Sequence, residues 1–189
     1  EISSCDWSSD VCSSDLTVMN GNGSNGIVFD GSTDYTNNAC GVSRDARVDG
    51  FIIRGGTASD GAGILFKNGA SGTVANSIVT GNTATNFGGG IYIGNGYNGG
   101  CAGRTGDALI YNTEISHNRA STGAGIYNDG SAFLSVNNTV SGNIAQTAAG
   151  FYNNGGNPGM RNTIIWGNLT NGALGADITN TGGGMPASS

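Results

Sequence analysis

A short pattern recurs along most of this chain, and the repeat limits the possible folds more than any other feature. One copy reads Asn112-Thr-Glu-Ile-Ser-His-Asn118 and leads to Gly125-Ile-Tyr127. The position of the second Asn is filled in successive copies by Asn22, Gly56, Asn82, Asn118, Asn143 and Asn168. These positions are 34, 26, 36, 25 and 25 residues apart. The basic period is therefore about 25 residues, and two junctions carry insertions.

Each period contains residues that favour short strands. Runs such as Ile78-Val79 and Ile164-Ile165 are β-prone, and glycine-rich segments separate them. A period of about 25 residues with two or three short strands is typical of one coil of a parallel β-helix. Horseshoe repeats would need a regular Leu framework, which this chain lacks. The sequence therefore predicts an all-β solenoid of about six coils over residues 17–178.

Equivalent positions of successive coils stack about 4.7–4.9 Å apart in such a solenoid. The column expected to point inward is apolar in every copy and comprises Met19, Ile53, Val79, Ile115, Val140 and Ile165. The second-Asn column predicts a structural ladder of amides that hydrogen-bond along the helix, formed by Asn22, Asn82, Asn118, Asn143 and Asn168. We expect the coil to be narrow at a column of alanines, which comprises Ala58, Ala84, Ala120 and Ala145. At a column of glycines we expect a backbone conformation or contact that a side chain would hinder; it comprises Gly63, Gly90, Gly125, Gly150 and Gly175.

The first sixteen residues share nothing with the repeat. Residues 6–16 reverse-translate codon by codon into a sequencing-library adapter, so we interpret residues 1–16 as a non-native leader and exclude them from the fold. The natural segment then begins near Thr17 and is part of a longer protein. Without the four acidic residues of the leader, the formal charge changes from −6 to −2. We interpret residues 179–189 as a disordered or truncated tail.

Charge and hydropathy argue against two kinds of partner. The chain has 13 acidic and only 7 basic residues, whereas binding to nucleic acid requires an excess of Lys and Arg. No apolar run is long enough to cross a bilayer, so we expect no transmembrane segment here.

The repeat resembles a known group of bacterial proteins. Ile-x-x-Asn-x-Ala followed by Gly88-Gly-Gly-Ile-Tyr92 is similar to the repeats of chlamydial polymorphic outer membrane proteins. Asn162-Thr-Ile-Ile-Trp-Gly-Asn168 is similar to a late coil of bacterial surface proteins that end in a choice-of-anchor segment. The resemblance implies a right-handed, pectin-lyase-like parallel β-helix. It also implies an extracellular or outer-surface location and a structural or adhesive passenger that contacts glycans or cell surfaces.

The insertions, near residues 30–47 and 94–107, each follow the second strand of a coil and should leave the same side of the solenoid. Insertions in repeat proteins often gather on a binding face. We therefore predict a recognition surface for a polysaccharide or another cell surface, and tolerated loops with solvated charges are the alternative. The candidate ligand-binding residues are Tyr35, Arg44, Asp45, Tyr97, Arg104 and Asp107.

One cysteine lies in each insertion, and a Cys40–Cys101 disulfide would join the two loops; two separate thiols are the alternative. His117 is the only histidine and no Cys-x-x-Cys motif occurs, so we predict no metal site and no cofactor. Acidic residues in the insertions are the one place where Ca²⁺ could be held.

Catalysis is the second hypothesis, because many parallel β-helices are polysaccharide lyases or glycoside hydrolases. Hydrolysis usually needs two carboxyl groups about 5–9.5 Å apart. Aligning the copies places no two acids in one column of neighbouring coils, so we assign no catalytic residue. The tyrosines that follow the inward Ile, namely Tyr92, Tyr127 and Tyr152, are expected to face outward and to stabilise the sheet.

Overall fold

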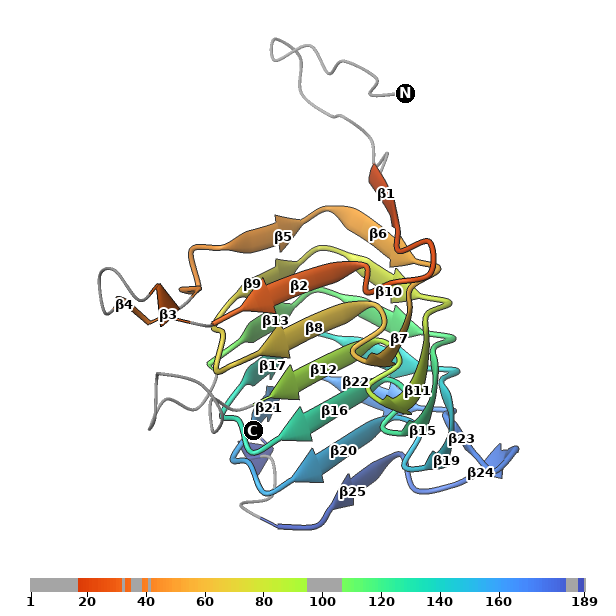
Figure 1. Cartoon of the computed structure of the whole chain (residues 1–189). Coiled ribbons are helices and arrows are strands. Elements are labelled where there is room, and N and C mark those ends of the chain that lie inside the picture. Colours follow the sequence, from red (N-terminus) through yellow and green to blue (C-terminus); the bar gives the residue numbers. More distant parts are fainter. Residues whose placement is uncertain are drawn as a thin grey trace, which may run out of the picture.

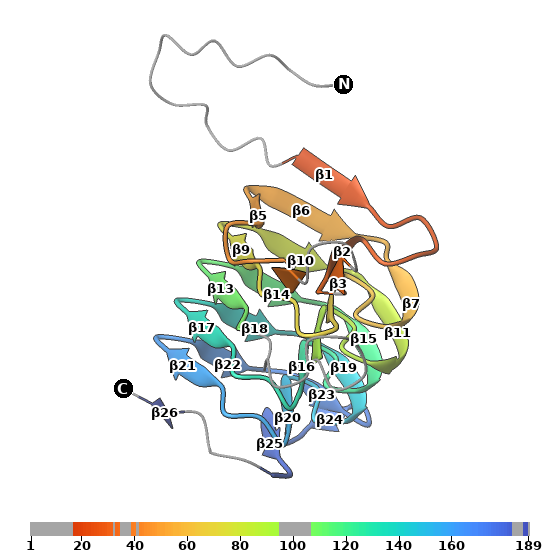
Figure 2. The same ribbon diagram turned by 60° about the vertical axis from the view of Figure 1, so that its left-hand side comes forward.

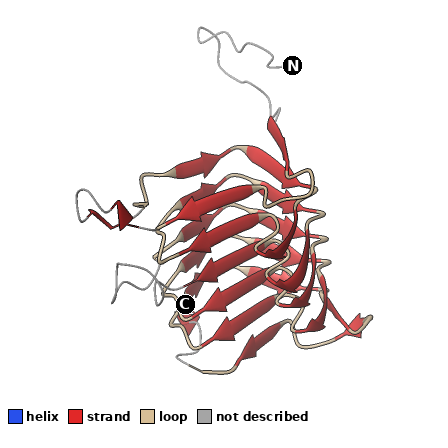
Figure 3. Cartoon of the chain, in the orientation of Figure 1, coloured by secondary structure: helices blue, strands red, loops and turns tan. Residues whose placement is uncertain are grey.

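The computed structural model describes residues 17–31, 33–34, 39–40, 42–94, 107–182 and 187–188, the side chains of 33–34, 39–40 and 187–188 excepted. Within these ranges the chain consists of strands, turns and loops, without a helix (Figure 3). The strands stack coil on coil into a parallel β-helix, which confirms the fold predicted from the repeat (Figure 1).

Four sheets form the walls of the solenoid, and each contains six strands. The first sheet contains β1 (Thr17–Asn20), β6 (Phe51–Arg54), β10 (Ile78–Thr80), β14 (Glu114–Ser116), β18 (Thr139–Ser141) and β22 (Ile164–Trp166). The second contains β7 (Thr57–Asp60), β11 (Thr83–Phe87), β15 (Arg119–Thr122), β19 (Ile144–Thr147), β23 (Leu169–Thr170) and, antiparallel to β23, β24 (Ala173–Leu174).

The third sheet contains β2 (Ile27–Asp30), β8 (Ile64–Lys67), β12 (Ile91–Gly94), β16 (Ile126–Asp129), β20 (Phe151–Asn154) and β25 (Ile178–Asn180). The fourth contains β5 (Arg47–Asp49), β9 (Thr73–Ala75), β13 (Leu109–Tyr111), β17 (Leu134–Val136), β21 (Gly159–Arg161) and β26 (Ala187–Ser188). A complete coil thus has four strands, more than the two or three expected from the sequence. Figure 2 shows the strands of the fourth sheet lying one above another.

The register of the strands agrees with the predicted columns. Met19 pairs with Ile53, Ile53 with Val79, and the column continues in this way to Ile165. The column points inward, and Ile53 and Val79 are completely buried. The alanine column is also in register, since Ala58 pairs with Ala84 and Ala120 with Ala145. The repeat therefore predicts which residues line the core as well as the type of fold.

A ladder of buried asparagines runs parallel to the solenoid axis. The side-chain amide of Asn82 donates to Asn118 Oδ1 at 3.0 Å, and Asn118 donates to Asn143 Oδ1 at 3.0 Å. Asn143 donates to Asn168 Oδ1 at 2.9 Å. Each amide nitrogen also donates to a backbone carbonyl, as Asn118 does to Val79 at 2.9 Å. The ladder thus satisfies polar groups that would otherwise be buried without partners.

Asn22 does not belong to this ladder, which corrects the sequence-based assignment. It lies exposed in a turn with a φ of 45°. The first coil is wider here, because Thr57 N–H donates to the carbonyl of Ser24 at 3.0 Å and Ser24 N–H donates to that of Gly21. The ladder ends instead at Gly56, whose backbone N–H donates to Asn82 Oδ1 at 3.0 Å.

The last coil differs from the repeat in a similar way. Asp177 Oδ1 accepts both the backbone N–H and the side-chain amide of Asn168, at 3.1 and 2.8 Å, and so closes the ladder. A Cβ on Gly150 would lie 2.4 Å from the carbonyl oxygen of Asp177, so Asp177 takes the place expected for Gly175. The boundary predicted at residue 178 falls within β25, and β25 and β26 add to the third and fourth sheets.

Both insertions leave the solenoid at the corner between the third and fourth sheets. The first lies between β2 and β5 and contains a short antiparallel hairpin of β3 (Thr33–Asp34) and β4 (Ala39–Cys40), on the left of Figure 1. The second lies between β12 and β13. Because the two strands before the insertions, β2 and β12, belong to one sheet, the insertions start on the same side.

Replacing Asn118 by Ala should lower the free energy of unfolding by roughly 3 kcal/mol or more, because several buried groups lose their partners at once. Urea unfolding followed by circular dichroism measures the change. Asn86→Ala is the matched control: Asn86 is exposed, and its replacement should change stability by less than about 0.5 kcal/mol. Equal effects of the two substitutions would show that the ladder does not stabilise the fold.

Candidate functional site

The roots of the two insertions meet in an ion pair. The guanidinium of Arg44, from the first insertion, pairs with the carboxylate of Asp107, from the second. Arg44 Nε also donates to the backbone carbonyl of Asp107 at 2.7 Å. The side chains are 42% and 54% exposed, so water screens the pair and its energy is small. Its importance is geometric, because it joins two segments that lie 63 residues apart in the chain.

The neighbouring turn holds these roots in place. Thr73 Oγ1 donates to the carbonyl of Arg44 at 2.8 Å, and the backbone N–H of Asp107 donates to Ser71 Oγ at 3.2 Å. Asp45 does not contact this pair through a described hydrogen bond; Oδ2 of Asp45 accepts from Ser43 Oγ at 3.0 Å. Of the candidate ligand-binding residues, the structure therefore brings Arg44 and Asp107 together.

The remaining candidates lie outside the described residues or side chains. Tyr35, Tyr97, Arg104 and Cys101 fall in segments that the structure does not describe, and only the backbone of Cys40, in β4, is described. Ligand binding by these residues and the Cys40–Cys101 disulfide therefore stay predictions.

A second ion pair, between Arg47 and Asp49, lies in β5, where the first insertion returns to the solenoid. Arg47 donates to Asp49 Oδ2 through Nε at 2.8 Å and through a terminal nitrogen at 2.6 Å. Its guanidinium carbon lies 5.2 Å from the centre of the Tyr111 ring. Hydrogen bonds from Asn76 and Arg47 lower the pKa of Asp49. These contacts fix the outer face of the fourth sheet beside the insertion roots.

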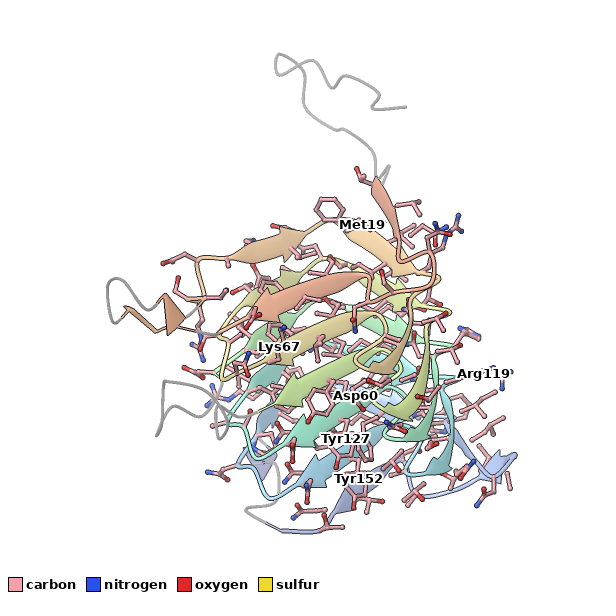
Figure 4. The ribbon with its side chains drawn as sticks, in the orientation of Figure 1. Met19, Asp60, Lys67, Arg119, Tyr127 and Tyr152 are labelled. Atoms are coloured by element: carbon pink, nitrogen blue, oxygen red, sulfur yellow. The ribbon has the colours of Figure 1, made fainter. Side chains whose placement is uncertain are left out.

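The tyrosines of the repeat form a stack on the outer face of the third sheet (Figure 4). The ring centres of Tyr92 and Tyr127 lie 5.5 Å apart, and those of Tyr127 and Tyr152 lie 5.1 Å apart, with nearly parallel rings. Phe87 covers Tyr127 at 4.6 Å and leaves it only 6% exposed. Tyr127 is thus buried although its side chain points away from the core. Because Tyr127 has a ring on each side, a sugar cannot stack on it.

Two aspartates from different strands lie near Tyr92 and raise its pKa. Tyr92 Oη donates to Asp129 Oδ2 at 2.9 Å, and the Asn154 amide donates to Asp129 Oδ1 at 2.9 Å. Burial, followed by Asp129, raises the pKa of Tyr92 far above its ordinary value, and Asp60 also contributes. Asp60 Oδ2 accepts from Ser59 Oγ at 3.0 Å, whereas its buried Oδ1 has no hydrogen-bond partner among the described residues.

This cluster is not apparent from the repeat, because its two aspartates lie in different columns. Asp60 pairs with Phe87 at the end of the second sheet, and Asp129 pairs with Gly94 in the third. Gly61, with a φ of 58°, turns the chain between Asp60, at the end of β7, and β8 in the third sheet. The available signal was the position of Asp60 directly before a glycine turn that recurs in the next two coils, where Gly88 and Gly123 have similar φ values.

His117 occupies a corner where most copies have glycine. It has a φ of 55° and its ring lies over Gly142, so its contacts are those of a turn residue. In the described part of the chain, no three His, Cys, Asp or Glu side chains gather as they would around a metal ion.

Comparisons with protein-family models, curated proteins and solved structures found no match to this chain. The fold itself defines the class, which is the all-β parallel β-helix. No helical segment in the described ranges could cross a bilayer.

Stability should fall at alkaline pH because of the tyrosine stack. Burial, then Asp129, raises the pKa of Tyr127 from 10.0 to about 12 in the folded chain. The resulting stabilisation is complete below the unfolded-state pKa near 10 and is lost as the pH rises through about 12. Urea unfolding across this range should show the decline, and the double variant Tyr92→Phe, Tyr127→Phe should show a shallower one. The same slope in both proteins would contradict this assignment.

Proposed function

We propose that this chain belongs to a secreted or cell-surface bacterial β-helix protein that acts as a structural and adhesive passenger and binds glycans. The observation that carries the proposal is the Arg44–Asp107 ion pair, because it joins the roots of the two insertions. Two loops fixed to each other at the base offer a ligand one composite surface. A binding face on the insertion-bearing side is therefore a better explanation than two independent loops.

Several of the repeated columns are not open to a ligand. The asparagine ladder and the inward columns are buried, and Tyr127 is covered by the rings beside it. The insertions contain arginine, aspartate and tyrosine, residue types that bind sugar hydroxyls through charge-assisted hydrogen bonds and aromatic contacts. The partner we propose is a polysaccharide or another cell surface, and the location is extracellular or on the bacterial outer surface.

Trp166 is an exposed aromatic side chain outside the insertions. It projects outward from β22 and is 72% exposed, and Ile164 on the same strand is 62% exposed. Since Trp166 lies on the first sheet, away from the corner where the insertions leave, its replacement distinguishes binding by the loops from binding by this sheet.

A glycan array, followed by titration of the ligands that bind, tests the proposal. The full chain should bind at least one polysaccharide without turnover. Alanine at Tyr35, Tyr97 or Arg104 should weaken binding about tenfold, the effect of about 1.4 kcal/mol. Trp166→Ala is the control and should leave the affinity unchanged. The proposal fails when all three loop variants bind as tightly as the parent chain.

A carbohydrate-active enzyme, either a polysaccharide lyase or a glycoside hydrolase, is the second candidate. Asp60 and Asp129 favour it, because both raise the pKa of Tyr92 and because one buried carboxylate oxygen of Asp60 has no partner in the described part of the chain. Carboxyl groups of this kind serve as acid, base or nucleophile in glycoside hydrolysis.

Release of unsaturated or reducing ends from acidic polysaccharides is the measurement for this candidate. Asp60→Asn and Asp129→Asn should each abolish the release, whereas Glu114→Gln, in β14 on the first sheet, should not. Absence of release by the parent chain, or equal release by all variants, would exclude catalysis at this cluster.

A further inference from the structure

A second row of asparagines lies on the outside of the solenoid, at the corner where the strands of the fourth sheet lead into those of the first (Figure 2). Asn112 Nδ2 donates to Asn76 Oδ1, and Asn137 Nδ2 donates to Asn112 Oδ1, both at 3.2 Å. The row comprises the exposed residues that directly follow β9, β13, β17 and β21, namely Asn76, Asn112, Asn137 and Asn162. We call these four residues the outer amide row.

The outer amide row begins at the root of the first insertion. Asn76 Nδ2 donates to Asp49 Oδ1 at 2.8 Å, and Arg47 donates to the other carboxylate oxygen of Asp49. From there the row passes from coil to coil, since the strands before and after it are paired in register. It therefore extends the surface of the insertion roots along the axis of the solenoid.

The turn at this corner does not by itself require asparagine. The four residues have φ values between 47° and 54°, in the left-handed region. At the next corner, between the first and second sheets, most copies make a left-handed turn with glycine, and φ lies between 63° and 69° in Gly55, Gly81, Gly142 and Gly167. Glycine adopts such a φ without steric cost, so the turn alone does not account for four successive amides.

Burial does not require the row either. The ladder through Asn118 is buried and must satisfy its amides internally, whereas water reaches the outer amides. An asparagine amide has two hydrogens and an oxygen with two lone pairs. Asn112 uses one hydrogen toward Asn76 and one lone pair toward Asn137, so one of each remains for a ligand.

The chemistry and the spacing of the row together define the ligand. Each amide is neutral and can both donate and accept a hydrogen bond, as a sugar hydroxyl can, whereas an ionised carboxylate only accepts. Successive amides follow the coil spacing of about 4.7–4.9 Å. An extended β-1,4-linked polysaccharide repeats its sugars at close to this spacing, so that one sugar can face each amide.

We propose that the outer amide row binds a neutral, β-1,4-linked polysaccharide that lies parallel to the solenoid axis, with one sugar on each of the four asparagines. The inference rests on the proposed glycan-binding function and adds a second site to the one formed by the insertion loops. Because the row starts beside the first insertion, a single polysaccharide chain contacts both sites.

Calorimetric titration of the full chain with cello-oligosaccharides, from the disaccharide to the hexasaccharide, tests the site. The affinity should rise with each added sugar up to the tetrasaccharide, because each sugar reaches a further amide. The triple variant Asn76→Gly, Asn112→Gly, Asn137→Gly should bind the tetrasaccharide about tenfold more weakly or worse, because three amides no longer bond the sugars.

The substitutions are chosen to leave the fold intact. Glycine preserves the left-handed turns, so circular dichroism of the triple variant should match that of the parent chain. Asn171→Gly is the matched control, because Asn171 is exposed with a φ of 52° in the turn between β23 and β24. This turn belongs to the second sheet, away from the row, and the control should leave the affinity unchanged.

The outcomes separate this inference from the proposed function. A triple variant that binds the tetrasaccharide as tightly as the parent chain, or an affinity that does not grow with chain length, would overturn the outer site. Binding of acidic polysaccharides alone would overturn it as well. If the variants of Tyr35, Tyr97 and Arg104 still weaken glycan binding in these cases, the proposed function stands without the outer site. A parent chain that binds no glycan at all would overturn both.

Discussion

Stacking of each coil on the next is the constraint on which the rest of this structure depends. Every strand obtains its backbone hydrogen bonds from the coils above and below, so a side chain must suit the same position in two neighbouring coils. The asparagine ladder shows this most clearly, because Asn118 accepts from Asn82 and donates to Asn143. A polar group can be buried at this position only because each copy of the repeat supplies a partner for the next. The repeat in the sequence is thus a direct consequence of the hydrogen-bond chemistry.

The ends of such ladders need separate solutions, and the chain uses different ones. A carboxylate, Asp177, accepts two hydrogen bonds from Asn168 at one end of the buried ladder, and the backbone N–H of Gly56 donates at the other. Asn22 cannot take part, because the first coil widens through the turn around Ser24. These end groups differ from the repeat in residue type, and a pattern that recognises only repeated residues cannot find them.

The sequence therefore predicted the columns that carry the Asn, Ala and apolar residues of the motif and missed the parts of the fold outside the motif. The inward column and the alanine column could be aligned from spacing alone, because stacking imposes a fixed register. The fourth strand of each coil was missed, since runs such as Leu134–Val136 are only three residues long and separated from the motif. Asp60 and Asp129 were missed because the chain folds them toward Tyr92 from two different columns. The loop residues were identified only as departures from the period.

Specific chemistry in a solenoid arises where a column changes its residue type. Two such changes occur in β12 and β16: Ile93 is followed by Asn128, and Gly94 by Asp129. The second insertion leaves directly after β12, at the same corner of the helix. The two strands nevertheless stay in register at these positions, because Ile93 pairs with Asn128 and Gly94 with Asp129. A carboxylate therefore accepts from Tyr92 outside, and an amide replaces an aliphatic side chain inside, within a sheet that remains fully stacked.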